Sequence, residues 1–377
     1  MKSFLFILAS LISFSLGFKI EKGDNDKLIF AVQLTRHGAR STANHIDFPN
    51  ITTHEWAEGL GQLTGLGGRQ HYLLGIKNEK RYRVENQFLN KDFDPREIAI
   101  YSTDANRTIM SVYSELLAWY PLGTVEKIKN KEKFQAIPPF EFIGKADAEK
   151  SLGNDPTLHG FQPVSIHSGY QTNKMLRAND YDICPATRYY ARLAKEDPKF
   201  EEINKKYIDN ILKSVREDWG ISKTLDFASV DPFTDSYYSA MFDLRLKEEF
   251  ALDNDKIDAM FADRFYQYFM LRDEVARLAS TNFLAFVTNN MDAKIFAFSP
   301  NGTSDDSHLK LVLMSAHDST LAAILSGVEQ KQKVQPFYAS SILIELWQKE
   351  GTEGTSGDDF YAQWIYDGKP LNIGGIC

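Results

Sequence analysis

The chain has 377 residues, 43% of them hydrophobic and 25% charged, a length and composition that allow two packed cores. Its formal net charge of −8 at neutral pH argues against a general affinity for nucleic acid or for anionic membranes. With only two cysteines, Cys184 and Cys377, it is not a disulfide-dense scaffold, and the sequence leaves open whether these two pair or stay free.

The first 17 residues are typical of a secretory signal. A positive start with Lys2 precedes an apolar run at 4–16, and small residues at 15–17 suit cleavage. The run is too short to span a membrane, and no later stretch is long and apolar enough to be an anchor. We therefore expect a soluble mature chain of about 360 residues outside the cytosol, whose charge changes from −8 to −9 when Lys2 is removed. Three N-glycosylation sequons fit this route, at Asn50, Asn106 and Asn301.

An apolar run at 28–34 predicts the first buried strand, and it ends just before the stretch 36–40, Arg-His-Gly-Ala-Arg. Gly38 marks the turn out of the strand. The turn places the His37 imidazole between the guanidinium groups of Arg36 and Arg40, which suits a strongly anionic ligand such as phosphate. By itself, a charged turn after a strand is more often a solvated loop.

A glycine-rich stretch at 61–75 leads into a helix that we expect to begin after Thr64, a plausible N-cap. No strand precedes these glycines, and their spacing matches neither the dinucleotide-binding fingerprint nor the P-loop. They are interpreted as positions of close backbone packing.

Two later segments repeat the order of strand, polar residues and helix. In the first, Arg107 follows a predicted strand at 97–101. In the second, His317 and Asp318 follow a predicted strand at 309–314. Each residue also has an ordinary explanation: a surface salt bridge for Arg107, a satisfied core histidine for His317 and a helix N-cap for Asp318.

Between about 135 and 273, prolines, aromatics and charged helical patterns alternate without a clear series of strands, which predicts a mostly helical insertion. A long helix at 273–291 leads back to predicted strands at 341–346 and 361–365. Strands alternating with helices predict an α/β fold, with an open, mostly parallel sheet covered by helices on both faces. The expected division is a signal at 1–17, an α/β core at 18–134 and 274–377, and a helical cap at 135–273.

In open α/β sheets, ligands bind outside the carboxyl ends of the strands, so the three junctions are expected to form one pocket. The expected ligands of a phosphoryl group are Arg36, Arg40, Arg107 and His317. In this reading His37 attacks phosphorus in line as a covalent nucleophile. Asp318 then gives a proton to the leaving group and later accepts one from water. Because the arginines keep His37 deprotonated while Asp318 needs a proton, we expect an acidic pH optimum.

The Arg-His-Gly-x-Arg and His-Asp-Ser-Thr motifs resemble those of the histidine acid phosphatases, in the prostatic and lysosomal branch of the phosphoglycerate mutase-like superfamily. Further motifs match in order and spacing: Gly61-Gln62-Leu63-Thr64, Gln70-His71, Leu74-Gly75, Ser102-Thr103-Asp104, Arg107-Thr108, Gln162-Pro163, Ile166-His167-Ser168, Tyr338-Ala339-Ser340 and Glu345-Leu346. The resemblance covers nearly the whole mature chain and is weakest in the second half of the insertion. It implies His37 as the phosphorylated nucleophile, Asp318 as the acid, the same phosphate ligands, and a reaction without metal or other cofactor.

The chain departs from this family in three ways. Thr42 stands where the family motif usually has proline, which questions the rigidity of the loop more than the chemistry. Most of the family's cysteines are missing, although Cys377 stands where the family's tail cysteine would. The chain also stops shortly after that point, without the membrane-spanning tail of some lysosomal relatives.

One sequon conflicts with the expected site. Asn106 precedes Arg107, and a glycan there would crowd the pocket. We therefore expect Asn106 to be unmodified, whereas Asn50 and Asn301 are candidates for glycosylation.

The leading hypothesis is a secreted or lysosomal acid phosphatase acting on small phosphate monoesters, with no nucleic-acid partner and as a monomer or a homodimer. A phytase-like inositol phosphate phosphatase is the enzymatic alternative, and it would need more basic residues around the pocket mouth. A non-catalytic secreted phosphate-binding protein is the alternative from another class, and the presence of both His37 and Asp318 argues against it.

Overall fold

The computed structural model describes residues 23, 25–43, 56–178, 184–207, 231–252, 272–298, 302, 308–332 and 335–373. The expected signal at 1–17, the sequon residues Asn50 and Asn301, and Cys377 lie outside these ranges.

The described residues form a six-stranded sheet in the order β2-β3-β1-β4-β5-β6. Its strands are β1 (Lys27–Arg36), β2 (Ile98–Ser102), β3 (Leu311–Ala316), β4 (Ser341–Gln348), β5 (Phe360–Tyr366) and β6 (Lys369–Leu371). β3 pairs in parallel with β1 and β2, and the other pairs are antiparallel, so β1, β2, β3 and β5 share one direction. The five predicted strands are confirmed. β6 was not predicted, because three residues that include Pro370 carry no strand pattern.

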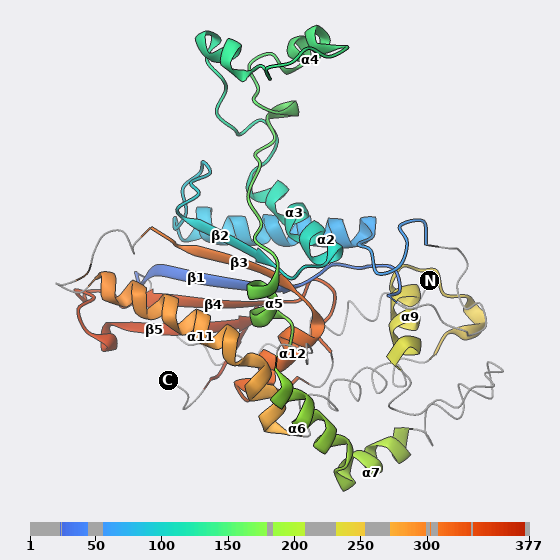
Figure 1. Cartoon of the computed structure of the whole chain (residues 1–377). Helices are drawn as coiled ribbons and strands as arrows, with labels where there is room; N and C mark the ends of the chain where they lie inside the picture. The colour runs from blue at the N-terminus through green and yellow to red at the C-terminus, as the bar shows by residue number, and fades with distance from the viewer. Residues whose placement is uncertain are drawn as a thin grey trace.

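Helices cover both faces of the sheet (Figure 1). α2 (Gly65–Glu79) and α3 (Asn106–Trp119) lie on one side, and α11 (Asp273–Ala297) and α12 (Asp318–Gly327) on the other. Alternate residues of β1 pack against the helices on opposite faces of the sheet, because successive side chains of a strand point to opposite faces. Phe30, Val32 and Leu34 belong to the core that includes α11 and α12, whereas Ala31 belongs to the core on α3. Burial on both faces explains why the strand reads as an almost uninterrupted apolar run.

The described part of the predicted insertion contains helices and no strand of the sheet. Its α-helices are α4 (Lys145–Leu152), α5 (Tyr170–Leu176), α6 (Pro185–Lys195), α7 (Pro198–Tyr207) and α9 (Asp231–Phe242). α4 lies on an arm that extends away from the sheet, and α9 lies beside one end of the sheet (Figure 1). The shorter helical segments among the described residues are η1 (Lys80–Glu85), η2 (Asn130–Ala136), η3 (Leu158–Gly160), η5 (Glu248–Phe250) and η7 (Gly357–Asp359). The boundaries at 135 and 273 stay a prediction.

Glycines allow the start of α2 to pack against the loop after β1. A Cβ at Gly67 would lie 2.1 Å from the carbonyl oxygen of Ala39, and one at Gly38 would lie 2.4 Å from the carbonyl oxygen of Gly67. Further along α2, a Cβ at Gly75 would lie 2.6 Å from the carbonyl oxygen of Glu115 in α3. The interpretation as sites of close backbone packing is confirmed for Gly67 and Gly75, whereas nothing lies within 4 Å of a Cβ at Gly65.

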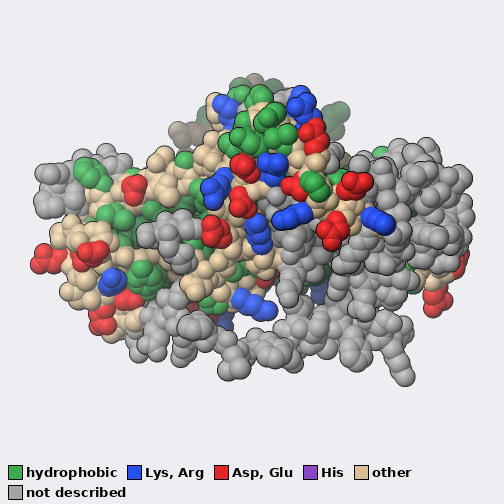
Figure 2. Space-filling model, turned by 90° about the horizontal axis from the view of Figure 1, so that it is seen from below, with side chains coloured by type: hydrophobic (Ala, Val, Ile, Leu, Met, Phe, Trp, Pro, Cys, Tyr) green, Lys and Arg blue, Asp and Glu red, His purple; other side chains and the backbone are tan. Residues whose placement is uncertain are grey.

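The described surface carries charges of both signs. On the face in Figure 2, lysine and arginine side chains are interspersed with aspartate and glutamate. No helix among the described residues is sufficiently long and apolar to cross a membrane.

Candidate active site

The strand register brings the three predicted junctions to one edge of the sheet. Arg36 of β1 pairs with Ala316 of β3, and Ser102 of β2 pairs with Ser315 of β3. Because all three strands are parallel, the residues that follow them lie together. These residues are His37, Thr103 and His317. The expectation that distant segments meet at the carboxyl ends of the strands is therefore confirmed.

His37 is buried and is held in one tautomer. Its Nδ1 lies 2.9 Å from the carbonyl oxygen of Gly38. A carbonyl oxygen only accepts hydrogen bonds, so Nδ1 carries the proton and Nε2 keeps a lone pair. The backbone N–H of His37 donates to the carbonyl oxygen of Ala316 at 3.0 Å, which ties the loop to β3.

The surroundings of His37 keep its ring neutral in acid. Burial lowers the pKa of His37 well below its ordinary value, and the charges of Arg107, Arg40 and Arg36 lower it further. Its Nε2 lone pair is therefore retained at mildly acidic pH.

Three buried arginine donors of the site have no hydrogen-bond partner among the described residues. They are the Nε atoms of Arg36, Arg40 and Arg107. Burial, followed by the charge of Arg40, lowers the pKa of Arg107 to about 10, so this guanidinium is still a cation at neutral pH. Although burial lowers the pKa of Arg40, nearby Tyr338 and Asp235 raise it above its ordinary value. Buried unpaired donors on cations are costly, and an anion that accepts from them removes that cost.

His317 lies beside His37 and Thr103. The His37 and His317 ring centroids are 5.6 Å apart at an interplanar angle of 73°. Nε2 of His317 lies 3.0 Å from the hydroxyl oxygen of Thr103. Burial and the charge of Arg107 lower the pKa of His317 to about 3, so it is also neutral in mild acid. A neutral ring with one N–H suits a hydrogen-bond donor to a phosphate oxygen.

Asp318 is the first residue of α12. Its Oδ1 accepts from the backbone N–H of Ser319 at 2.7 Å, and its Oδ2 lies 2.8 Å from Nη2 of Arg36. The remaining end nitrogen of Arg36, Nη1, donates to the carbonyl oxygen of Pro336 at 2.6 Å. The N-cap of α12 is His317, so Asp318 is not the cap; it lies in the first turn of the helix and contacts Arg36 inside the predicted site.

Tyr338 forms part of the site wall, although the sequence assigned it no role. β4 runs antiparallel to β1, with Ser341 opposite Thr35, so the loop before β4 lies at the same edge as the end of β1. The Arg36 guanidinium carbon lies 4.2 Å from the centroid of the Tyr338 ring, a cation–π contact. Tyr238 of α9 packs on Tyr338 with ring centroids 5.0 Å apart. The available signals were its position just before a predicted strand and its place in the matching motif Tyr338-Ala339-Ser340.

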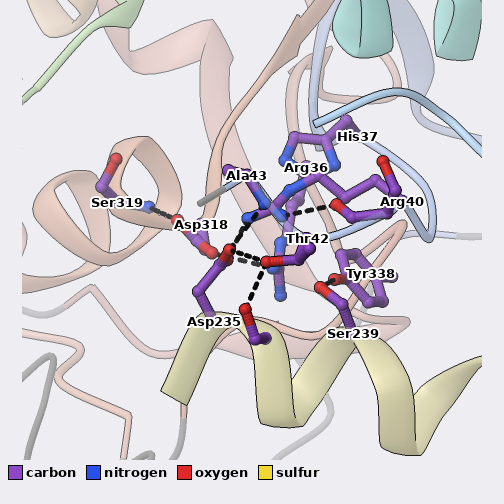
Figure 3. A network of polar contacts seen from close by, with 12 residues as sticks. Arg36, His37, Arg40, Thr42, Ala43, Asp235, Ser239, Asp318, Ser319 and Tyr338 are labelled. Atoms are coloured by element: carbon purple, nitrogen blue, oxygen red, sulfur yellow. Dashed lines mark hydrogen bonds and ion pairs between the residues drawn. The ribbon is translucent and has the colours of Figure 1, made fainter. Parts of the chain in front are cut away.

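Asp235 of α9 is the second residue that sequence reasoning missed. Its carboxylate lies 2.5 Å from Nη2 of Arg40 (Figure 3), and the two residues are 195 positions apart in the chain. No local motif marks Asp235, because its position depends on how α9 packs against the sheet edge.

Two other predicted positions lie away from these contacts. Asn106 is exposed and donates to Oε1 of Gln62 at 3.1 Å, beside Arg107, and its lack of a glycan stays a prediction. Cys184, at the N-terminal end of α6, is half-buried. Among the described residues, no group of three or more His, Cys, Asp or Glu is placed to hold a metal ion.

The family profile described as "Histidine phosphatase superfamily (branch 2)" matches residues 26–367. The chain belongs to this superfamily. Human prostatic acid phosphatase is 28% identical over 367 residues, covering 92% of this chain and 82% of the relative. Lysosomal acid phosphatase from Xenopus laevis is 27% identical over 342 residues, covering 86% of this chain and 67% of the relative. The resemblance to histidine acid phosphatases is confirmed.

Solved structures of two phytases share the fold. The phytase from Hafnia alvei in complex with myo-inositol hexakis sulphate matches with a TM-score of 0.61, at 14% identity, over 91% of this chain and 85% of its own. The phytase from Klebsiella sp. ASR1 matches with a TM-score of 0.59, at 14% identity, over 91% and 83%. These matches confirm the α/β fold class, and at this identity they concern the fold alone.

Proposed function

We propose that this chain is an acid phosphatase that hydrolyses phosphate monoesters through a phosphohistidine on His37. The observation that carries the proposal is a neutral histidine with a free Nε2 beside three buried arginine Nε donors without partners. The donors of Arg36, Arg40 and Arg107 suit the non-bridging oxygens of a phosphoryl group. His317 supplies a further neutral donor.

The reaction has two steps. In the first, Nε2 of His37 forms a bond to phosphorus while the bond to the ester oxygen breaks, and Asp318 gives its proton to the leaving oxygen. In the second, water attacks phosphorus, the P–N bond breaks, and Asp318 takes a proton from that water. Asp318 therefore ends the cycle protonated, ready for the next substrate.

The ion pair between Arg36 and Asp318 bears on the protonation of Asp318 and therefore on the pH optimum of the reaction. Asp318 pairs with Nη2 of Arg36, so a phosphate that accepts from Nε of the same guanidinium brings negative charge beside the carboxylate. This charge favours protonated Asp318, as does a low pH. His37 stays neutral at the same pH because its pKa is lowered. We expect an acidic optimum, and a rate profile peaking above neutral would count against these roles.

The expected location is the cell exterior or the lysosome. The signal-like segment at 1–17 supports the secretory route, and relatives named lysosomal acid phosphatase support a lysosomal alternative. On that route Asn50 and Asn301 are the candidate glycosylation sites. The mechanism needs no second subunit, because all its residues belong to one chain.

Hydrolysis of p-nitrophenyl phosphate at acidic pH, with and without EDTA, tests the proposal. We expect turnover that the chelator does not change, and a loss of at least about 10³-fold in kcat for His37→Ala. Inositol hexakisphosphate is expected to be a poorer substrate, because Asp235 and Asp318 place two carboxylates at the pocket. A folded wild-type sample without turnover would falsify the enzyme assignment, and chelator sensitivity would contradict the metal-free mechanism.

A further inference from the structure

Asp235 contacts Arg40, Thr42 and Ala43 of the loop that follows β1 (Figure 3). Its side chain is 5% exposed. Oδ1 accepts from Nη2 of Arg40 at 2.5 Å, and Oδ2 accepts from the backbone N–H of Ala43 at 2.8 Å. Oδ2 also lies 3.3 Å from the hydroxyl oxygen of Thr42, which contacts the Ser236 hydroxyl as well. Asp235 and Ser236 of α9 therefore supply polar partners to Arg40, Thr42 and Ala43.

The same loop is held on its other side by the segment before and within α2. The backbone N–H of Ala39 donates to Oε1 of Gln70 at 2.8 Å, and that of Ser41 donates to the carbonyl oxygen of Gln62 at 3.0 Å. The N–H of Gly61 donates to the carbonyl oxygen of Thr42 at 2.7 Å. Asp235 thus fixes the loop from the side that α2 does not reach.

Arg40 is bound by the described residues at both of its terminal nitrogens but not at Nε. Its Nη1 donates to the carbonyl oxygen of Ser41 at 3.0 Å, and its Nη2 is bound by Asp235. Its Nε is buried without a partner. A planar guanidinium held at both terminal nitrogens has little freedom to rotate, so the direction of its Nε–H is set by the protein.

We propose that Asp235 is a positioning residue through which the insertion sets the phosphate-binding geometry of Arg40 and of the loop at 40–43. The inference rests on the proposed function of the pocket. Asp235 acts through Arg40, and the roles of His37 and Asp318 do not depend on it.

Two other roles for Asp235 lead to different results. If it only attached α9 to the core, its loss would lower stability without a specific effect on phosphate. If it competed with phosphate for Arg40, its loss would tighten phosphate binding. The geometry favours positioning over competition, because Asp235 binds Nη2 and leaves Nε available.

The test is the affinity of the full chain for inorganic phosphate, measured by calorimetry for the wild type and for Asp235→Ala. Asp243→Ala is the matched control, since Asp243 directly follows α9, has a side chain that is 8% exposed, and pairs with Arg245 at 3.0 Å. We expect Asp235→Ala to weaken phosphate binding by about ten- to a hundredfold, as for other residues that orient a ligand-binding group. Asp243→Ala is expected to stay within about twofold of the wild type, because its arginine is not a proposed phosphate ligand.

A double-mutant cycle with Arg40→Ala separates positioning from a general effect. In the Arg40→Ala background, removal of Asp235 is expected to change phosphate affinity by less than about threefold, because the group that it orients is gone. If Asp235→Ala does not fold, as judged by its thermal unfolding midpoint, Asp235→Asn is used. That variant keeps an oxygen for Arg40 but puts an amide opposite the N–H of Ala43, and we expect at least about threefold weaker binding.

The inference would be overturned if the Asp235 variants bound phosphate as tightly as the wild type or more tightly. It would also be overturned if removal of Asp235 lowered phosphate affinity equally in the wild-type and Arg40→Ala backgrounds. These outcomes are distinguishable from failure of the proposed function. A wild type that binds phosphate but has no turnover contradicts the phosphatase and leaves the positioning role intact. A wild type with turnover whose Asp235 variants bind phosphate normally contradicts the positioning role alone.

Discussion

At the scale of single residues, the site combines a neutral nucleophile with fixed cations. The backbone carbonyl of Gly38 sets the tautomer of His37, and burial beside the arginines keeps its ring deprotonated. His37 must be deprotonated for the first step, whereas Asp318 must hold a proton. Because different neighbours set the two protonation states, both states are compatible with an acidic pH.

The role of Asp318 predicts a dependence on the leaving group. We expect Asp318→Asn to lower kcat/KM for an alkyl phosphate by about 10²- to 10⁴-fold, because an alkoxide leaves only with a proton. The loss for p-nitrophenyl phosphate is expected to be much smaller, since nitrophenolate is a stable anion. Steady-state kinetics with both substrates measures the difference.

Ser319→Ala is the control for that measurement, because it keeps the backbone N–H that Asp318 accepts. Equal losses for the two substrates in Asp318→Asn would mean that Asp318 is not the proton donor.

At the scale of elements, the fit between α2 and the loop after β1 depends on Gly67. An added Cβ would meet backbone atoms of Ala39 at 2.1 and 2.6 Å, and backbone atoms cannot move aside as a flexible side chain can. The loop that would shift is the one that carries His37 and Arg40. Packing of α2 is therefore coupled to the geometry of the pocket.

This coupling predicts opposite effects for two glycines of the same helical turn. We expect Gly67→Ala to destabilise the protein by about 1–3 kcal/mol, in the range of overpacked positions, and to lower kcat/KM. Gly65→Ala, where nothing lies within 4 Å of the new Cβ, is expected to be neutral or stabilising by up to about 1 kcal/mol. Urea unfolding and p-nitrophenyl phosphate kinetics test both variants. Similar effects of the two substitutions would contradict the packing argument.

The elements also show what the sequence could predict. Each strand-to-helix junction has a local pattern, so Arg36, His37 and His317 could be found and the parallel register then brought them together. Asp235 has no such pattern, since its contact with Arg40 spans 195 positions and depends on the packing of α9. A residue that is brought to a site by tertiary packing, as Asp235 is, has no local sequence pattern that marks it.

At the scale of the whole molecule, two buried neutral histidines make stability depend on pH. The folded-state pKa of His317 is lowered from its ordinary 6.5 to about 3, and that of His37 is also lowered. Between these values the unfolded chain binds protons that the folded chain does not. The contribution of the two neutral histidines to the free energy of unfolding is therefore fully present above about pH 6.5. It is lost progressively as the pH falls toward 3.

The prediction is tested by urea unfolding of the wild type and His317→Gln over this pH range. The free energy of unfolding of the wild type is expected to fall more steeply with decreasing pH than that of the variant, because the variant lacks one of the two titrating groups. Carboxylates away from residue 317 contribute equally to both proteins, so the difference between the two curves reports His317 and its interaction with Asp318. Parallel curves would show that His317 is not held neutral by the fold.

The central claim is that phosphate passes through a covalent bond to Nε2 of His37, and trapping that intermediate tests it most directly. The wild type is mixed with a phosphate monoester at acidic pH, quenched rapidly in alkali, where phosphohistidine is stable, and digested for mass spectrometry. The account predicts a phosphorylated peptide that contains His37, present during turnover and absent from His37→Ala. Turnover without a phosphorylated His37, or a phosphoryl group on another residue, would contradict it.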